Sequence, residues 1–476
     1  TTRGYRAPTT PAEEAVASAF AAVLGIDRVG ADDSFLDLGG DSLSATRAVG
    51  RINSALDTDV GVAALFDAPV VSDLAVRIDS EMMTSSVSPA LTARPRPERI
   101  PLSLAQQRMW FVNQFDTASA AYNIPVALQL DGALDLGALQ AALGDVLERH
   151  ESLRTVFPGS ADGPRQMIAY SALVTPDLDP IPVSEGALRD SLAALFGVGF
   201  DVTEDLPLRV RLLRVAPEQH VLALVVHHIA ADGFSMAPLA RDVMLAYTAR
   251  AQQQAPGWVP LPVQYADYSL WQRETLGTDK QPDSMLSGLL DYWTRTLSGI
   301  PDVLPLPLDR PRPAQRSQVG AVVPFDIPPD VHQTLADLAH RSNSTLFMVV
   351  HAALAVLLTR VSGSEDVVVG TPIAGRGHAA LDDVVGMFVN TLVLRTPVPA
   401  GTSFAELLTD VRSVDLGAFE HADLPFERLV DELAPERSTA HSPLFQVLLE
   451  FQNATRTHLE LPGLTARSLD VDLDVA

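Results

Sequence analysis

The sequence contains no cysteine and few basic residues: 34 lysines and arginines stand against 59 aspartates and glutamates. The lack of cysteine excludes a cysteine nucleophile, disulfide bonds and thiolate metal ligands. The formal net charge of −25 argues against nucleic acid and anionic membranes as partners, because polyanions bind clusters of Lys and Arg side chains.

Long hydrophobic segments are also lacking. The longest apolar run, from Leu346 to Leu358, is interrupted by His351 and is too short to span a bilayer, so it predicts a buried helix. The N-terminal residues are polar, and no apolar core typical of a secretory signal follows them. We therefore expect a soluble, cytoplasmic protein that binds neither membranes nor nucleic acid. With 476 residues, 47% of them hydrophobic, the chain predicts two or more globular units.

The first unit, residues 8–80, has the pattern of a small helical bundle. Thr10 and Glu13 form a capping box around Pro11, which suits the first helical position, and Gly25 ends that helix. Apolar residues recur at helical spacing in three further segments, residues 43–52, 60–65 and 71–78. The unit is therefore predicted to be an all-α four-helix bundle.

Residues 81–99 are rich in Ser, Thr, Pro and Arg, a composition that favours extended structure, so they are predicted to be a flexible linker. After the linker, helical patterns alternate with β-rich runs, which indicates an α/β or α+β unit over residues 100–476. This unit has more residues than a single hydrophobic core usually supports. We expect an N-terminal subdomain up to about residue 275 and a C-terminal subdomain from about residue 276 to residue 476.

Ser42 follows Gly-Gly-Asp and opens the second helix, where backbone N–H groups and the helix dipole favour a phosphate group. A phosphodiester on its hydroxyl is one interpretation, and a simple helix N-cap formed by Asp41 or Ser42 is another. A third is the Gly-Asp-Ser-Leu nucleophile of esterases, with Asp337 and His340 as acid and base. We reject the esterase, because its serine follows a buried strand whereas Ser42 follows a helix and a loop.

His227 and His228 end an apolar, β-rich run over residues 221–226. Neighbouring strand residues point to opposite faces, so the pair cannot bind one metal ion, and no metal site is expected. One histidine should face a cleft and the other the packed interior. Asp232 and Gly233 should then make a tight turn into a helix that starts near Phe234. The alternative for Asp232 is a simple N-cap.

Two resemblances follow from these motifs. Residues 33–43, Asp-Ser-Phe-Leu-Asp-Leu-Gly-Gly-Asp-Ser-Leu, resemble the attachment signature of peptidyl carrier proteins of nonribosomal peptide synthetases. The likeness covers about residues 8–80. It implies that Ser42 carries 4′-phosphopantetheine, added by a separate phosphopantetheinyl transferase, and that the thiol of this group holds an aminoacyl or peptidyl thioester.

The motif His-His-x-x-x-Asp-Gly resembles the condensation domains of the same synthetases, whose fold is a V-shaped pair of chloramphenicol-acetyltransferase-like subdomains. Other segments match that family in order. They are residues 103–110, 149–155, 265–268 with 271–272, 370–372 with 375–376, 387–391 and 421–426. The chain is thus expected to be a carrier–condensation didomain.

The second resemblance implies a reaction, in which the amine on a downstream carrier attacks the thioester on the upstream carrier and forms an amide. His228 is then the catalytic histidine, acting as base or as a hydrogen-bond partner of the amine, and His227 supports its placement. Because thioesters are already activated, the domain mostly has to hold two tethered substrates in line. The backbone N–H of Gly233 is the candidate for oxyanion stabilisation.

Asp232 is mainly structural in that family, and a buried carboxylate needs a cation, for which we favour Arg376. Asn390 lies in a matching segment and is a supporting residue. The implied partners are an upstream adenylation domain and a downstream carrier, on a monomeric chain. The family's condensation domains continue for another strand and helix layer, so the domain is expected to be incomplete at its C-terminus.

Three rivals stay open at this stage. An epimerase of the same fold shares the histidine motif, although the opening motif and the Asn390 segment are closer to condensation. A catalytically silent recruitment domain, which docks carriers or a tailoring enzyme, typically loses the histidine motif. A coenzyme-A-dependent acyltransferase with an unrelated helical appendage would leave Ser42 unmodified.

Overall fold

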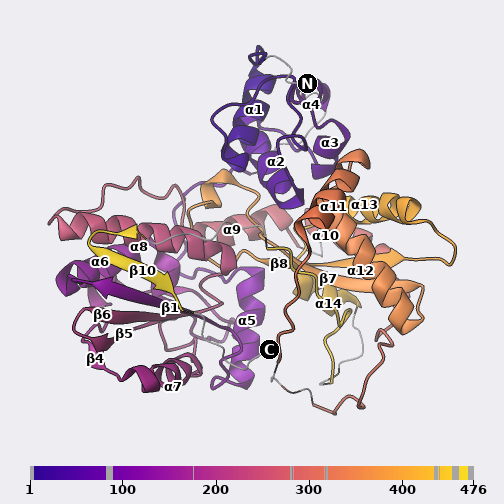
Figure 1. Ribbon diagram of the computed structural model, residues 1–476. Helices are drawn as coiled ribbons and strands as arrows, with labels where there is room; N and C mark the ends of the chain where they lie inside the picture. Colours follow the sequence, from indigo (N-terminus) through magenta and orange to yellow (C-terminus); the bar gives the residue numbers. More distant parts are fainter. Residues whose placement is uncertain are drawn as a thin grey trace.

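A computed structural model describes residues 5–81, 89–174, 176–278, 281, 283–315, 317, 320–433, 438, 440–452 and 460–469. A helical bundle sits on top of a two-lobed α/β body, over the lobe formed by the C-terminal subdomain (Figure 1). The order of these parts along the chain agrees with the sequence prediction: helical bundle first, then two α/β subdomains.

The bundle consists of α1 (Pro11–Leu24), α2 (Ser42–Leu56), α3 (Val62–Asp67) and α4 (Val71–Glu81). The Thr10 side chain accepts a hydrogen bond from Glu13 N at 3.1 Å, and Gly25 ends α1 with φ of 69°, as the capping signals predict. Phe20 and Phe35 are fully buried at the centre, with ring centroids 4.7 Å apart. The predicted all-helical bundle is confirmed.

The N-terminal subdomain is built on a six-stranded sheet in the order β4-β5-β6-β1-β10-β9. Its long apolar strand β6 lies inside the sheet between β5 and β1 and is buried throughout residues 220–227. The strands are β1 (Asn123–Gly132), β4 (Ile181–Pro182), β5 (Leu208–Ala216), β6 (Gln219–His227), β9 (Glu460–Leu461) and β10 (Leu464–Ser468), beside a small pair β2 (Thr155–Val156) and β3 (Met167–Ile168). The helices are α5 (Leu104–Phe115), α6 (Leu136–Arg149), α7 (Glu185–Phe196), α8 (Met236–Ala251) and α9 (Tyr265–Leu276).

The C-terminal subdomain packs helices around the antiparallel pair β7 (Asp366–Ile373) and β8 (Asn390–Pro397). Its helices are α10 (Met285–Thr296), α11 (Pro329–Arg341), α12 (Leu346–Ser362), α13 (Phe404–Glu420) and α14 (Phe426–Leu433). The apolar run predicted to be a buried helix is α12. In the described part of the chain no single helix has the length and apolar character to cross a membrane; α11 and α12 meet those criteria only as a pair, which is bent by 105°.

The chain returns to the N-terminal subdomain near its end. Strand β10 pairs with β1 in antiparallel register, with Leu128 opposite Ser468 and Leu130 opposite Ala466. It lies in the other lobe from the elements that precede it (Figure 1). The division at residue 275, with everything later in the C-terminal subdomain, is therefore wrong for residues 460–469. The strands in this segment, β9 and β10, are short, and their sequence does not indicate which sheet they join.

The linker also differs from the prediction. Residues 89–99 form neither helix nor strand, but they are not a free tether, because Arg96 pairs with Glu151 at 2.6 Å and with Asp267 at 3.1 Å. Leu91 is buried in an aromatic cluster that contains Tyr268. The composition that resists regular structure also supplies the arginines that anchor this stretch to acidic residues.

Candidate functional site

Ser42 is the first residue of α2 and is buried where the bundle meets the C-terminal subdomain. Asp41 caps the helix in a capping box with Ser44, which leaves the Ser42 side chain without a capping role. Its hydroxyl shares a hydrogen bond with the hydroxyl of Thr345, with 2.9 Å between Oγ and Oγ1. Thr345 is the N-cap of α12, so this contact joins the start of one helix to the start of another.

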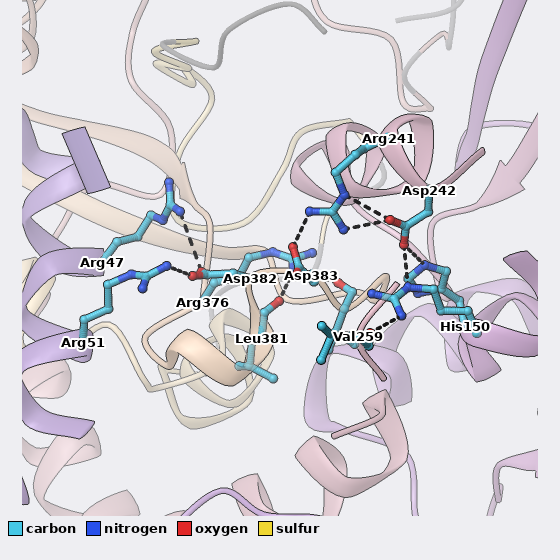
Figure 2. A network of polar contacts seen from close by, with 12 residues as sticks. Arg47, Arg51, His150, Arg241, Asp242, Val259, Arg376, Leu381, Asp382 and Asp383 are labelled. Atoms are coloured by element: carbon cyan, nitrogen blue, oxygen red, sulfur yellow. Dashed lines mark hydrogen bonds and ion pairs between the residues drawn. The ribbon is translucent and has the colours of Figure 1, made fainter. Parts of the chain in front are cut away.

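Further contacts hold the bundle on the C-terminal subdomain. Arg51 forms a short ion pair with Asp382, and Arg47 lies 3.7 Å from the same carboxylate, as Figure 2 shows. On α3, the Phe66 carbonyl accepts a hydrogen bond from Asn343 Nδ2 at 3.0 Å. Gly50 is packed so closely that a Cβ there would overlap the carbonyl of Gly377. Charge and shape thus both fit α2 to this surface.

A cavity of roughly 510 Å³ lies between the bundle and the body. Its lining includes Ser42, Trp271 and Phe234, and Phe234 is two residues beyond Asp232. The cavity therefore connects the surroundings of Ser42 with the turn that follows the histidine pair, two motifs that lie far apart in the sequence.

The histidine pair lies at the end of β6, and its members differ in environment. His227 is buried, packs its ring edge-on against Phe200 at 5.7 Å and accepts a hydrogen bond at Nδ1 from Ile229 N. Burial, with the neighbouring charges of His228 and Arg209, lowers the pKa of His227 to about 4, so this ring is neutral at pH 7.

His228, the first residue after β6, lies in a turn and is only half-buried. Its backbone N–H donates to the Tyr122 carbonyl at 2.8 Å, and its Nδ1 lies 3.0 Å from Sδ of Met387. The two histidines thus have different environments, although only His227 belongs to the strand and His228 lies in the turn that follows it. Met387 comes from the C-terminal subdomain, so His228 lies where the two lobes meet.

Asp232 is completely buried and fully hydrogen-bonded. One carboxylate oxygen accepts from Ser235 N at 2.8 Å and lies 3.2 Å from Arg376 Nη2, and the other accepts from the N–H groups of Phe388 and Val389. Asp232 is thus the N-cap of the turn at Gly233 and also the anchor of a segment from the other lobe. The ion pair with Arg376 that the sequence predicts is present.

The segment around Arg376 joins several parts of the molecule. Arg376 also donates to the carbonyls of Leu381 and Val384, and its guanidinium lies 4.3 Å from the centre of the Phe388 ring. Asp382 binds the helical bundle, and its neighbour Asp383 pairs with Arg241 of α8 at 2.6 Å. Figure 2 shows these two adjacent carboxylates pointing to opposite sides.

The remaining predicted residues, Gly233 and Asn390, have distinct positions. Gly233 is exposed, and a Cβ built on it would meet no heavy atom within 4 Å. Asn390 donates to the carbonyls of Ala422 and Leu424 at 2.8 and 2.7 Å and accepts from Phe426 N. It fixes a loop on the cavity wall and lies apart from the described contacts of His228.

Sequence reasoning missed Thr345 and Asp382, and it noted Met387 only as part of a matching segment, without its contact with His228. Thr345 precedes an apolar helix, and its sequence context indicates only an ordinary N-cap, without indicating that its hydroxyl also contacts Ser42.

Among the residues that the structure describes, no group of three or more His, Cys, Asp or Glu side chains is arranged to hold a metal ion.

Comparisons with known proteins place this architecture in a family. Residues 97–471 match the model of the condensation domain, and residues 14–78 match the model of the phosphopantetheine attachment site. The chain therefore belongs to the condensation domain family of nonribosomal peptide synthetases, acyltransferase-type enzymes that form peptide bonds between carrier-bound substrates, and it carries a carrier domain with a serine for covalent 4′-phosphopantetheine.

Relatives and solved structures agree with this assignment. The chain is 48% identical to a dimodular nonribosomal peptide synthase of Bacillus subtilis, over 96% of this chain and 19% of the relative. It is 43% identical to an isonitrile lipopeptide synthase of Mycobacterium tuberculosis, over 94% of this chain and 18% of the relative. The X-domain from teicoplanin biosynthesis has a similar structure, with a TM-score of 0.76 and 35% identity over 82% of this chain and 86% of that one. The chain thus spans about a fifth of the length of these curated relatives.

Proposed function

We propose that Ser42 carries the phosphopantetheine group and that the condensation domain of this chain takes the acyl group from it and joins it to the amine of an amino acid on a downstream carrier. The observation that carries this proposal is the cavity lined by both Ser42 and Phe234, the residue that directly follows the histidine motif. The docked carrier therefore places its attachment residue on a cavity that reaches the turn after the histidine pair.

The residues around Ser42 fit the cofactor. The serine is one of the residues that line a cavity of roughly 510 Å³, large enough for an extended organic chain, and its hydroxyl is not used as a helix cap. Apolar side chains such as Phe347 and Trp271 share the wall with polar groups. When bound, phosphopantetheine supplies the thiol that holds the acyl group as a thioester and leaves when the amine takes that group.

His228 is the proposed catalytic residue. Its ring is half-buried at the boundary of the two lobes, and Nδ1 lies against the Met387 sulfur, which leaves Nε2 to hold the attacking amine or to accept its proton. His227 is neutral and packed, so it positions the strand end without adding charge next to His228. The Gly233 N–H, at the start of the helical turn that Asp232 caps, is the proposed donor to the oxygen that becomes negative during acyl transfer.

In this proposal Asp232 and Arg376 contribute by holding backbone segments in place around His228. Their ion pair joins the turn that carries Gly233 to the segment that carries Met387, so it fixes the two lobes around His228. Asn390 holds the loop at residues 422–426 on the cavity wall. These three are positioning residues and do not touch the reacting atoms.

The specific partners are part of the proposal: a phosphopantetheinyl transferase that modifies Ser42, an upstream adenylation domain that loads the carrier and a downstream carrier with the acceptor amino acid. We propose a cytoplasmic monomer, since the modification draws on coenzyme A and the net charge of −25 does not favour anionic membrane surfaces. The histidine motif and the buried carrier contact favour this function over a recruitment domain or a free acyltransferase.

The test starts with the intact mass of the chain after incubation with a broad-specificity phosphopantetheinyl transferase and coenzyme A. We expect wild type to gain one phosphopantetheine and Ser42→Ala to gain none. The modified chain is then loaded with an aminoacyl group, and product formation with an amine acceptor is compared between wild type and His228→Ala. Lack of mass gain on folded wild type would refute the carrier assignment, and equal product formation by the two chains would refute the role of His228.

A further inference from the structure

The docked arrangement hides the residue that has to be modified. Ser42 has a relative exposure of 6%, and its Oγ is hydrogen-bonded to Thr345 Oγ1 at 2.9 Å. On the same helix, Gly50 lies directly against the Gly377 backbone. One face of α2 is therefore covered by the condensation domain along most of its length.

Attachment of phosphopantetheine needs that face to be open. The Ser42 oxygen must attack the β-phosphate of coenzyme A in line, so that a new O–P bond forms, the pyrophosphate P–O bond breaks and adenosine 3′,5′-bisphosphate leaves, while the hydroxyl proton passes to a base on the transferase. A transferase and coenzyme A have no route to an oxygen that is covered by a second domain and engaged with Thr345. The transferase and the condensation domain therefore cannot occupy this face of α2 at the same time.

We infer that the docked chain is closed to phosphopantetheine attachment, and that Thr345 and Asp382 of the condensation domain set how much of the carrier is open. This inference rests on the proposed function, in which Ser42 is the attachment residue. Thr345 holds the serine hydroxyl itself, and Asp382 holds the helix through Arg47 and Arg51. Both residues are positioning residues for the carrier.

The inference sets the direction of a rate change. When the transferase is scarce, the rate of attachment is proportional to the fraction of undocked carrier, because only that form reacts. Loss of ion pairs that are partly exposed shifts such an equilibrium by about 2- to 5-fold. Weakening the condensation-domain side of the contact should therefore speed up a reaction that takes place on the carrier.

The experiment measures initial rates of attachment by intact mass, with coenzyme A and limiting transferase, on the full chain. Asp382→Asn removes the carboxylate that binds both arginines and should raise the rate about 2- to 5-fold. The matched control is Asp383→Asn, because that neighbouring carboxylate pairs with Arg241 inside the condensation domain and not with the carrier. Its rate should equal that of wild type. Every substitution lies outside the carrier, so the surface that the transferase recognises is unchanged.

Thr345 needs a separate control, because it also caps α12 by accepting a hydrogen bond from Met348 N. Thr345→Val should raise the attachment rate, and Thr345→Ser, which keeps the hydroxyl, should restore the wild-type rate. A role limited to capping would lower thermal stability in Thr345→Val and leave the rate unchanged. Salt should speed attachment in wild type more than in Asp382→Asn, since salt screens the ion pairs that this variant already lacks.

The outcomes separate the inference from the proposed function. Equal rates for wild type, Asp382→Asn and Thr345→Val, with one phosphopantetheine added to each, would refute the inference while leaving Ser42 as the attachment residue. An absence of attachment in every variant would refute the attachment residue itself and with it the inference.

Discussion

Arg376 and Asp232 come from different lobes of the condensation domain and form a buried ion pair, with 3.2 Å between Nη2 and Oδ1. Breaking one partner of such a pair leaves an uncompensated charge in the interior, which costs about 3–5 kcal/mol. We expect Asp232→Ala to lower the free energy of unfolding by that amount. All four tryptophans lie between residues 110 and 293, so urea unfolding followed by tryptophan fluorescence reports on the condensation domain alone.

A matched control for this prediction is Asp162→Ala. The carboxylate of Asp162 is 83% exposed and faces Arg99, so its loss should cost less than about 1 kcal/mol. A similar small effect for Asp232→Ala would contradict the structural role of the buried pair.

The two histidines should separate catalysis from stability. His228→Ala is expected to slow amide formation by about 10²- to 10⁴-fold, the usual contribution of a positioned acid or base, with little change in melting temperature. His227→Ala removes a buried ring packed against Phe200 and should lower the free energy of unfolding by about 2–5 kcal/mol. Product formation and thermal unfolding should be measured on both variants. A stable but inactive His227→Ala together with an active but destabilised His228→Ala would show that the two roles belong to the opposite histidines.

Stability should fall on acidification through a contribution from His227. The pKa of this residue is lowered to about 4 in the folded chain, against about 6.5 when unfolded, so below pH 6.5 the unfolded state binds more protons. The contribution is fully present above pH 6.5 and is lost progressively down to pH 4, and it amounts to about 3 kcal/mol. Urea unfolding at pH 7 and pH 5 should show about 2 kcal/mol of this loss, because pH 5 lies between the two pKa values.

His227→Gln, which does not titrate in this range, is the reference for the pH prediction. The difference in unfolding free energy between the two pH values should be smaller in this variant than in wild type. Identical pH dependence would mean that His227 is not held neutral by the fold.

Gly50→Ala should open the docked arrangement without damage to the carrier helix. Alanine raises helix propensity by about 1 kcal/mol in a helix interior, yet its Cβ would overlap the Gly377 carbonyl across the contact. We expect a larger radius of gyration by small-angle X-ray scattering than for wild type. Gly144→Ala is the control, because a Cβ at that helical position meets nothing within 4 Å.

Much of this fold is local, and local features could be predicted. Thr10 and Gly25 bound the first helix through capping rules that act over a few residues, and the sequence predicts different environments for His227 and His228, although only His227 belongs to the strand. The pairing of Asp232 with Arg376 was predictable because a buried carboxylate demands a cation and a matching segment carried one.

The rest depends on contacts between distant residues, which leave no periodic signal. Nothing near Thr345 or Asp382 indicates that a helix 300 residues earlier in the chain rests on them. The same holds for β10, whose five residues join the sheet of the other lobe, and for the linker, where Arg96 finds acids on two separate elements. The composition of residues 89–99 predicted a flexible linker, whereas the ion pairs of Arg96 attach this stretch to the condensation domain.

Ser42 and Thr345 are separated by 303 positions in the chain. At ribosomal rates of about 5–20 residues per second, roughly 15 to 60 s pass between the synthesis of the serine and that of its docking partner. All four helices of the carrier precede residue 82, so the carrier can fold during this interval while its covering surface does not yet exist. Each newly made chain thus passes through a period of translation in which the attachment residue is folded and uncovered.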